Sequence, residues 1–350
     1  MTATTDPLAV TIFAPEDLRI VEAPLGALQP GFVRIAFRAG GICGSDMHYF
    51  RHARTGDFLV TSPLILGHEI AGEIVEINAD APNLSVGDRV AVNPSRWCGH
   101  CQYCREDRPN LCENIYFMGS ASKTPHMQGG FASRFDAVPA QCVKVPSATP
   151  LQAAALAEPL AVCLHAVARA EPVAGRHVAI FGAGPIGLLT MLAARRAGAA
   201  LLTAFDVAAG PLEVARRLGA DRVVDVSAEG ATERAAMDLP IDIAFEVSGT
   251  PAGLTSAIGA VRRGGVVVQI GNLPGGAISI PANAVMAKEI DLRGSFRFGR
   301  EFDLAVGLIV SAEIDVLSIV TAEHALTDAV AGFRAALDRS RNIKVMLVAA

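Results

Sequence analysis

HVAIFGAGPIG, residues 177–187, is the stretch that decides the fold of this chain. An apolar strand runs directly into glycines, and the residues from there to 199 have the composition of a helix. Gly182, Gly184 and Gly187 stand in the G-x-G-x-x-G spacing. In that motif the first glycine permits a tight turn, the second lets a pyrophosphate approach the backbone, and the third allows close helix–strand contact. Glycines at a turn can serve packing alone, but the strand before and the helix after favour dinucleotide binding.

The next strand ends on an acid that bears on the choice of dinucleotide. Asp206 lies 19 residues beyond Gly187. A carboxylate there accepts hydrogen bonds from the adenosine ribose hydroxyls and repels a 2′-phosphate, so NAD is favoured over NADP. The residues that we expect to contact the cofactor are Gly182, Gly184, Pro185, Ile186, Gly187, Asp206 and Ser248.

Around this motif, strand and helix patterns alternate. Apolar strands are predicted at 177–184, 200–207, 221–226, 241–249, 264–271 and 290–298, and helices at 151–170, 185–199 and 211–220. Apolar strands that alternate with helices predict a parallel sheet with helices on both faces, the doubly wound α/β class.

The N-terminal part has a different rhythm. Residues 8–147 contain short β-type runs, such as 32–39, 70–77 and 88–94, separated by Gly, Pro and Asp. This pattern predicts a β-rich domain with many turns. The tail returns to helical patterns and ends in a strand-like run at 344–349.

Composition limits the function classes. The 350 residues carry a formal charge of −5 without a basic stripe, so nucleic acid and anionic membrane surfaces are not expected partners. The N-terminus lacks the cationic start and apolar core of a signal peptide, and no unbroken apolar run could span a bilayer, so we expect a cytoplasmic protein. Seven cysteines, an odd number, favour metal or thiolate use over a disulfide framework.

Four of the cysteines fall within 95–115, a segment that interrupts the β-rich zone like an inserted lobe. Cys98, Cys101, Cys104 and Cys112 have the spacing C-x₂-C-x₂-C-x₇-C. Four thiolates so close together match a closed tetrahedral zinc site with no vacancy for substrate. A redox-active pair and a zinc ribbon for nucleic acid are the alternatives. The crowding of four thiols disfavours the first, and the balanced charges around them disfavour the second. We therefore expect a structural zinc.

Four further metal-ligating side chains are dispersed along the chain. Cys43 lies in GGICGSDMHYF, His68 and Glu69 form a dyad in PLILGHEIAGE, and Glu158 lies in LAEPLAV. A thiolate, an imidazole and a carboxylate make a mixed three-ligand set that leaves one zinc position open for a substrate oxygen. Each also has an ordinary structural reading, as a buried thiol, a polar turn or a first-turn charge on a helix.

In order and from end to end, the chain resembles the zinc-dependent medium-chain dehydrogenases, and within them the polyol dehydrogenase branch. The matching stretches are GGICGSDMHY (40–49), GHEIAGEI (67–74), GDRVAVNP (87–94), the four-cysteine segment, AEPLAVCLHA (157–166), FGAGPIG (181–187), FEVSG (245–249) and RGSFRF (293–298). The resemblance implies a GroES-like catalytic domain over 1–150, an NAD-binding Rossmann domain over 151–298 and a return to the catalytic domain over 299–350.

The resemblance also implies a ligand set. Cys43, His68 and Glu69 would ligate a catalytic zinc, and Glu158 would either ligate it directly or hold its bound water. The implied cofactors are NAD and two zinc ions per subunit, one catalytic and one structural.

The implied reaction is the reversible oxidation of a secondary alcohol. Zinc lowers the pKa of a bound alcohol so that it can exist as the alkoxide, which passes a hydride to the nicotinamide. Ser45 would pass the alcohol proton toward the cofactor ribose, and His48 would be next in the relay toward solvent. The reaction would take place in the cleft between the domains.

The same resemblance bears on the substrate. NPSRWCGHCQYC (93–104) and FMGSASKTPHMQGGF (117–131) favour a sugar acid, and the leading reaction is oxidation of L-idonate to 5-keto-D-gluconate. A sorbitol- or xylitol-type polyol dehydrogenase is the alternative, although sorbitol dehydrogenases carry tyrosine where this chain has Phe298. The candidate substrate contacts are Tyr49, Arg54, Phe117 and Arg297.

Outside the enzymes, the alternative function is a non-catalytic sensor that binds zinc and a dinucleotide. The presence of all the ligands of a metal site with an open position disfavours this alternative. The expected partner is a small-molecule substrate, with neither nucleic acid nor membrane. The resemblance further implies a homodimer or homotetramer, formed through the edge strand near 290–296.

Overall fold

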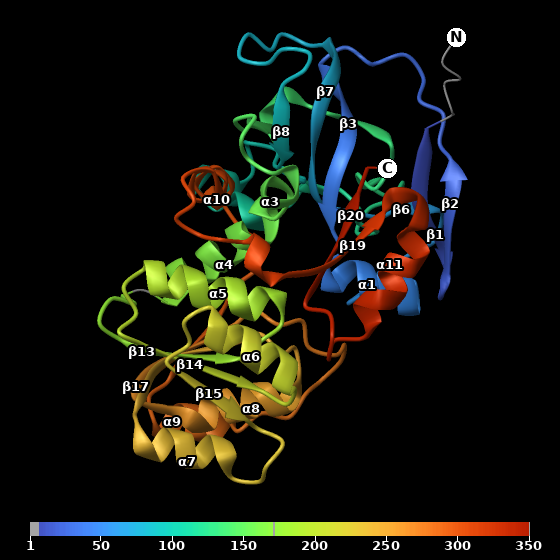
Figure 1. Ribbon diagram of the computed structural model, residues 1–350. Coiled ribbons are helices and arrows are strands. Elements are labelled where there is room, and N and C mark those ends of the chain that lie inside the picture. The colour runs from blue at the N-terminus through green and yellow to red at the C-terminus, as the bar shows by residue number, and fades with distance from the viewer. Residues whose placement is uncertain (1–6, 171, 350) are drawn as a thin grey trace. The chain divides into compact units, whose positions relative to one another are not determined.

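The computed structural model describes residues 7–170 and 172–349, drawn as a ribbon in Figure 1. The chain divides into two compact units. Unit 1 comprises Met1–Glu158, Phe302–Asp338 and Lys344–Ala350, and unit 2 comprises Pro159–Glu301 and Arg339–Ile343. Each unit is described by itself below.

Unit 2 is built around a parallel sheet. Its strands are β13 (His177–Phe181), β14 (Leu201–Asp206), β15 (Arg222–Asp225), β16 (Ile241–Glu246), β17 (Val261–Gln269) and β18 (Asp291–Gly294). They lie in the order β15-β14-β13-β16-β17-β18, and each strand pairs with its neighbour in parallel. The order reverses between β13 and β16, which makes this point the switch of a doubly wound sheet. The predicted fold class is confirmed.

Helices cover the sheet because its strands are apolar on both faces. All five residues of β13 are buried, and Phe181 stacks on Phe205 of β14 with ring centroids 4.4 Å apart. Figure 1 shows α5 and α6 on one face and α8 and α9 on the other. The helices are α4 (Ala157–Ala170), which begins in unit 1, α5 (Pro185–Arg196), α6 (Ala209–Arg217), α7 (Ala231–Asp238), α8 (Pro251–Ala260) and α9 (Ala282–Ala287).

Unit 1 is β-rich. Its main sheet comprises β3 (Phe32–Gly41), β7 (Glu69–Asn78), β8 (Arg89–Val92), β11 (Arg134–Ala137), β12 (Cys142–Lys144), β19 (Val320–Ala325) and β20 (Lys344–Val348). The order is β12-β8-β7-β3-β20-β19, and β11 also pairs with β3. The C-terminal strand β20 thus lies directly beside β3, with Met346 opposite Gly41.

Smaller elements complete unit 1. A three-stranded sheet holds β1 (Leu8–Ala14), β2 (Asp17–Glu22) and β6 (Leu64–Ile65), and two-stranded ribbons pair β4 (Arg54–Thr55) with β5 (Phe58–Leu59) and β9 (Ser95–Arg96) with β10 (Tyr116–Phe117). The helices are α1 (Gly44–His52), α2 (Gln102–Arg105), α3 (Leu151–Ala155), α10 (Glu301–Val310), whose first residue belongs to unit 2, and α11 (Ala329–Leu337). Phe333 of α11 is fully buried and packs edge-on against Phe50 and Phe131.

Two predicted elements need correction, and one strand was missed. The strand predicted at 290–298 ends at Gly294, and beyond it Arg297 adopts a left-handed φ of 53° that is incompatible with a strand. The single helix predicted at 151–170 is divided at Leu156 into α3 and α4. The tail contains the strand β19, which was missed because its half-exposed sequence VTAEHA lacks an apolar run.

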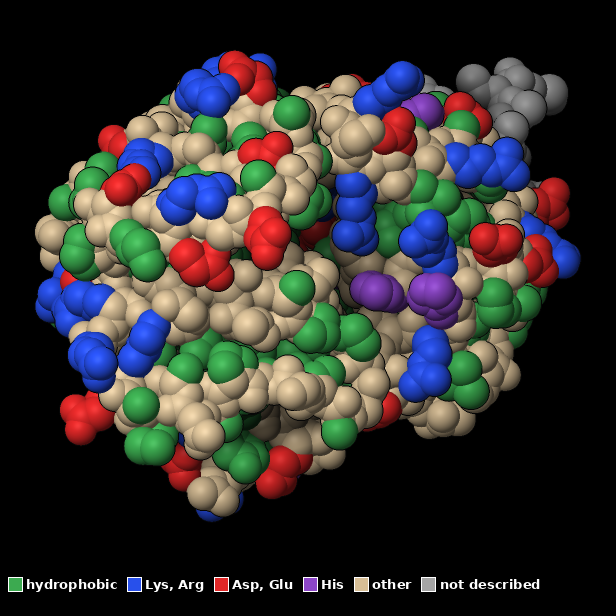
Figure 2. All heavy atoms as spheres, turned by 90° about the horizontal axis from the view of Figure 1, so that it is seen from below, with side chains coloured by type: hydrophobic (Ala, Val, Ile, Leu, Met, Phe, Trp, Pro, Cys, Tyr) green, Lys and Arg blue, Asp and Glu red, His purple; other side chains and the backbone are tan. Residues whose placement is uncertain are grey.

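Among the described residues, no helix is both long and apolar enough to cross a membrane. On the face in Figure 2, Lys and Arg side chains are interspersed with Asp, Glu and hydrophobic ones. No single-sign field dominates that face, which agrees with the small net charge of −5.

Candidate functional site: a mixed metal centre, a cysteine quartet and a glycine turn

The residues that link β3 to α1 carry the first ligand. Cys43 precedes α1 in an extended conformation. Asp46 is fully buried, and its Oδ2 accepts a hydrogen bond of 3.0 Å from Cys43 N. Its Oδ1 lies 3.6 Å from Nδ1 of His68. Because Asp46 faces Nδ1, Nε2 is the imidazole nitrogen left to bind a ligand. One acid therefore fixes both the helix start and the ring orientation.

The pairing of β3 with β7 brings three ligand-forming side chains together. Gly41, two residues before Cys43, lies opposite Glu69. A sulfur of Cys43, a ring nitrogen of His68 and a carboxylate oxygen of Glu69 all lie within 4.8 Å of one another. A Cβ at Gly41 would stand 2.0 Å from Glu69 Oε2, so only glycine at this position leaves room for the carboxylate. These three side chains are called the mixed centre below.

The mixed centre fits a divalent cation. Burial, followed by the negative charge of Glu69, raises the pKa of the Cys43 thiol to about 12. Glu69 is fully buried, and its Oε1 has no hydrogen-bond partner within residues 7–170 and 172–349. A buried acid with free lone pairs is stabilised when a metal replaces the lost solvation. Sulfur, nitrogen and oxygen donors suit zinc, and three of them leave one tetrahedral position open.

A buried lysine that the sequence analysis missed lies beside the mixed centre. Lys344, the first residue of β20, is 2% exposed, forms an ion pair with Glu69 Oε2 and donates from Nζ to Ile42 O at 3.0 Å. Burial lowers the pKa of this ammonium, but the charges of Glu69 and Cys43 outweigh burial, so the pKa is raised overall. Lys344 therefore supplies a fixed positive charge. Its only sequence signal is one lysine opening the apolar run KVMLV.

Glu158 lies near the mixed centre without belonging to it. This first-turn residue of α4 is 5% exposed, and its carboxylate is outside the set of described atoms that lie within 4.8 Å of one another. Burial raises its pKa to about 8, opposed by the charge of His68 and assisted by those of Glu69 and Cys43. Such a placement suits a carboxyl group that hydrogen-bonds a bound water or hydroxyl.

The two predicted proton-relay residues lie on α1. Ser45 Oγ is 3.5 Å from Nε2 of His68, so its hydroxyl lies beside the mixed centre. His48 is one turn further along the same helix, and its side chain is exposed. A hydroxyl next to the metal ligands and an imidazole at the surface are thus spaced along one short helix.

The four candidate substrate contacts are not equivalent. The Phe117 ring lies 5.5 Å from the His68 ring, centroid to centroid, and so borders the mixed centre. Tyr49 is 2% exposed in the core of unit 1, and its hydroxyl accepts a hydrogen bond from the Ala121 amide at 3.0 Å. This packing gives Tyr49 a structural role.

The two arginine candidates are on different units. Arg54 is exposed and donates to the Gly56 carbonyl within its own turn. Arg297 is on unit 2, half-buried, with its guanidinium 4.9 Å from the centroid of the Phe296 ring. Neither contact by itself indicates a ligand.

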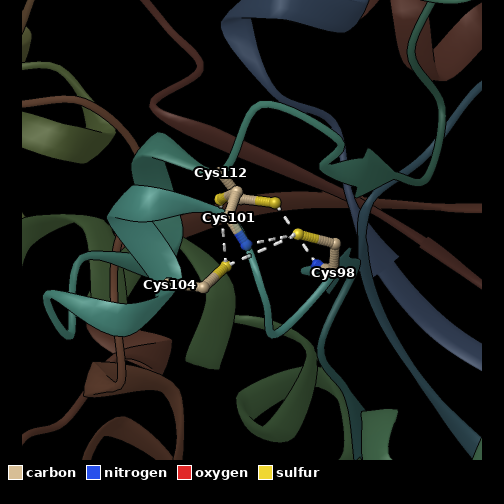
Figure 3. A group of neighbouring side chains, drawn as sticks. All are labelled: Cys98, Cys101, Cys104 and Cys112. Atoms are coloured by element: carbon tan, nitrogen blue, oxygen red, sulfur yellow. Dashed lines mark hydrogen bonds between the residues drawn. The ribbon is translucent and has the colours of Figure 1, made fainter.

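The four clustered cysteines converge in the lobe that β9 and β10 close at its base, as Figure 3 shows. Their sulfurs all lie within 4.8 Å of one another. Cys98 Sγ accepts from the Cys101 amide at 3.4 Å, and Cys112 Sγ from the Cys98 amide at 3.3 Å. Backbone hydrogen bonding, first from His100 and then from Cys101, lowers the pKa of Cys98 to about 6 despite some desolvation. Burial, followed by the neighbouring thiol of Cys101, raises the pKa of Cys104 to about 12, so it is the convergence of four sulfurs that fits a closed tetrahedral zinc site.

The glycine turn of unit 2 lies at the switch point of its sheet. Gly182 follows β13 with a φ of 107°, and a Cβ there would stand 2.8 Å from the Ser248 amide, which follows β16. A Cβ on Gly187 would stand 1.8 Å from Gly182 O, whereas one on Gly184 would meet nothing within 4 Å. Open space at Gly184 and the N-terminus of α5, which starts at Pro185, suit a pyrophosphate.

Two acids shape this cofactor region. Asp206 ends β14, and its carboxylate accepts from the Ala183 amide at 2.7 Å and from the Ala208 amide at 2.9 Å. Glu246, which the sequence analysis missed, is fully buried at the end of β16 and accepts from Ser248 Oγ at 2.5 Å. The only indication of Glu246 in the sequence was an acidic residue inside the apolar strand pattern FEVSG, residues 245–249. Glu246 thereby fixes the loop that carries Ser248.

Replacement of Cys98 should separate the two metal sites. We expect Cys98→Ser to retain one zinc per chain instead of two, and to unfold at a lower temperature, because three thiolates no longer close the tetrahedron. Elemental analysis and thermal unfolding measure both effects. Cys142→Ser, a half-buried thiol outside the quartet, is the control and should keep both ions. Two zinc ions in Cys98→Ser would contradict the assignment.

Replacement of Lys344 should destabilise the metal-free protein more than the zinc-loaded protein. Lys344→Met leaves the Glu69 carboxylate buried without a cation, which should lower the free energy of unfolding by about 3–5 kcal/mol. Added zinc should restore most of that loss. Urea unfolding of metal-free and zinc-loaded protein measures both. Lys144→Met removes an exposed partner of Asp88 and should have an effect below about 1 kcal/mol. Equal losses in the two variants would refute the role of Lys344.

Two family models match this chain. The alcohol dehydrogenase GroES-like domain matches residues 29–147, and the zinc-binding dehydrogenase model matches residues 185–311. The first match covers the mixed centre's Cys43, His68 and Glu69 and the cysteine quartet, and the second begins at the first residue of α5.

Named relatives agree with the family models. L-idonate 5-dehydrogenase (NAD(P)⁺) of Escherichia coli is 39% identical over 88% of this chain and 89% of its own, and a sorbitol dehydrogenase of Arabidopsis thaliana is 36% identical over 90% and 87%. The crystal structure of the Escherichia coli L-idonate 5-dehydrogenase superposes with a TM-score of 0.93 at 35% identity, covering 98% of both chains. The chain therefore belongs to the zinc-dependent medium-chain alcohol dehydrogenases, oxidoreductases that act on CH–OH groups and use zinc and a nicotinamide dinucleotide.

Proposed function

We propose that this protein is an L-idonate 5-dehydrogenase that oxidises L-idonate to 5-keto-D-gluconate with NAD. The observation that carries the catalytic part is the mixed centre, with three unlike donors within 4.8 Å of one another. Zinc held there by Cys43, His68 and Glu69 supplies Lewis-acid polarisation of the substrate oxygen. Glu158 holds a water or a substrate hydroxyl beside it.

The proton of the alcohol leaves through α1. Ser45 Oγ, 3.5 Å from His68 Nε2, is the hydroxyl placed to accept it while releasing its own proton toward the cofactor ribose. His48, exposed on the next turn, passes the proton to solvent. Asp46 holds the His68 ring and the start of α1, so it acts as a positioning residue. The glycine turn would hold the dinucleotide, whose nicotinamide would supply the hydride acceptor.

The substrate assignment is supported by two comparisons that name L-idonate 5-dehydrogenase, one in sequence and one in structure. Sorbitol dehydrogenases follow closely, so a sorbitol- or xylitol-type enzyme is the second candidate. Phe298, where sorbitol dehydrogenases carry tyrosine, is 2% exposed, and its ring has no hydroxyl to offer a polyol. One hydroxyl contact to a polyol is therefore missing, and the sugar-acid assignment is supported by the comparisons alone. Phe117, whose ring lies 5.5 Å from the His68 ring, would line the substrate site.

The assembly that we propose is a homodimer or homotetramer that pairs β18 strands. β18 is the last strand of its sheet, so one edge faces no further strand within the described residues, although its Gly294 carbonyl already accepts from Arg169 Nε at 3.1 Å. Leu292 and Phe296, on and just after this strand, are exposed by 39% and 51%. A second copy would cover both side chains.

A substrate panel tests the proposed reaction. Zinc-loaded protein with NAD should show its highest kcat/KM on L-idonate, with lower values on D-sorbitol and xylitol, as measured by NADH absorbance. Cys43→Ser should abolish turnover of all three because it removes one of three metal ligands. Brisk sorbitol turnover without idonate turnover would select the second candidate. Turnover of none by wild type, with two zinc ions bound, would favour a non-catalytic sensor.

Asp206 should set the preference for NAD. Asp206→Asn keeps an acceptor for the Ala183 amide but removes the charge, so kcat/KM with NAD should fall roughly 10-fold or more while that with NADP is kept or rises. Asp225→Asn is the matched control, because Asp225 lies opposite Asp206 in the neighbouring strand and is exposed. It should change neither value. An unchanged NADP/NAD ratio in Asp206→Asn would contradict the assignment.

A further inference from the structure

Two histidines lie one turn apart on the surface of unit 1. His48 and His52 stand at positions i and i+4 of α1, and both side chains are exposed. Their ring centroids are 6.2 Å apart, with the ring planes inclined by 37°. Side chains at i and i+4 of a helix project from the same face, so the two imidazoles are held as neighbours by the backbone itself.

This spacing suits one transition-metal ion. Two imidazoles four residues apart on a helix are the pair that helical zinc motifs use. Zinc–nitrogen bonds of about 2.0–2.1 Å at a tetrahedral angle place the centroids of two rings that share an ion about 5 Å apart. The observed separation is 6.2 Å, so the two exposed rings must approach each other by about 1 Å, through side-chain rotation, to bind a common ion.

The position on the helix has opposing electrostatic effects. His52 is the last residue of α1, where the partial negative charge of the helix C-terminus favours a cation. Arg51 is in the same turn, and its positive charge disfavours a bound cation. Imidazole binds Ni²⁺, Cu²⁺ and Zn²⁺ through a coordinate bond in addition to charge, so these ions are favoured over Mg²⁺ or Ca²⁺.

We propose that His48 and His52 form a third metal site, which binds a divalent transition-metal ion at the surface and thereby inhibits the enzyme. The site is separate from the mixed centre and from the cysteine quartet. Its inhibitory effect rests on the proposed function: an ion that occupies the imidazole nitrogens of His48 removes the group that passes the alcohol proton to solvent.

Nickel titration of the zinc-loaded holoenzyme tests the binding. We expect wild type to bind one Ni²⁺ per chain in addition to its two zinc ions, measured by equilibrium dialysis with elemental analysis. His52→Asn should weaken this binding about tenfold or more, because the second imidazole acts at a high effective concentration. His100→Asn is the control. His100 is also exposed, but the residues four positions before and after it are Arg96 and Cys104, so it has no histidine partner on either side. This variant should bind Ni²⁺ as wild type does. Absence of a third ion, or equal binding by His52→Asn, would overturn the site.

Activity measurements on the same proteins test the inhibition. Without nickel, His52→Asn should turn over substrate as fast as wild type, since His52 has no part in the proposed relay. With nickel at the concentration that half-saturates wild type, wild type should lose about half its activity, and His52→Asn nearly none. Nickel that binds wild type without slowing it would overturn the inhibition while leaving the site in place. If wild type turned over none of the substrates, the proposed function would be contradicted. The dialysis measurement would still decide whether the metal site exists.

Discussion

A carboxylate buried in the interior of unit 1 requires a positive charge, and the catalytic half of the molecule is arranged around that requirement. Glu69 is fully buried, and its neighbours include a thiol whose pKa burial raises to about 12. A carboxylate removed from water in this way loses its solvation, which only neighbouring positive charges can replace. Lys344 provides one positive charge, and a divalent ion held with Cys43 and His68 would provide the second.

The chain meets this requirement by joining its two ends. β20 pairs with β3, and β3 pairs with β7, so a lysine from the C-terminus, a thiol from the N-terminal part and a His-Glu dyad meet in one sheet. Lys344 is bound to the carbonyl of Ile42, directly before Cys43, which fixes the ammonium relative to the metal ligands. Catalytic precision in unit 1 thus depends on strand register over about 300 residues.

The features that could be predicted from the sequence alone were those contained in short, continuous segments. The glycine turn and the cysteine quartet are each defined within about fifteen residues, so their spacing alone predicts their chemistry. Cys43, His68 and Glu69 could be grouped only through the family resemblance, because a register between distant strands leaves no mark in a single sequence. Lys344 was missed for the same reason, since its meaning depends on a partner 275 positions away. The strand β19 was missed because an edge strand needs no apolar alternation.

Anomalous scattering at the zinc absorption edge, recorded on crystals of the protein as purified, tests the central claim most directly. The account predicts two zinc positions per chain: one bounded by four sulfurs, and one bounded by a sulfur, an imidazole nitrogen and a carboxylate oxygen, with Lys344 against the same carboxylate. A single zinc position at the four sulfurs, with Glu69 held by Lys344 alone, would contradict it.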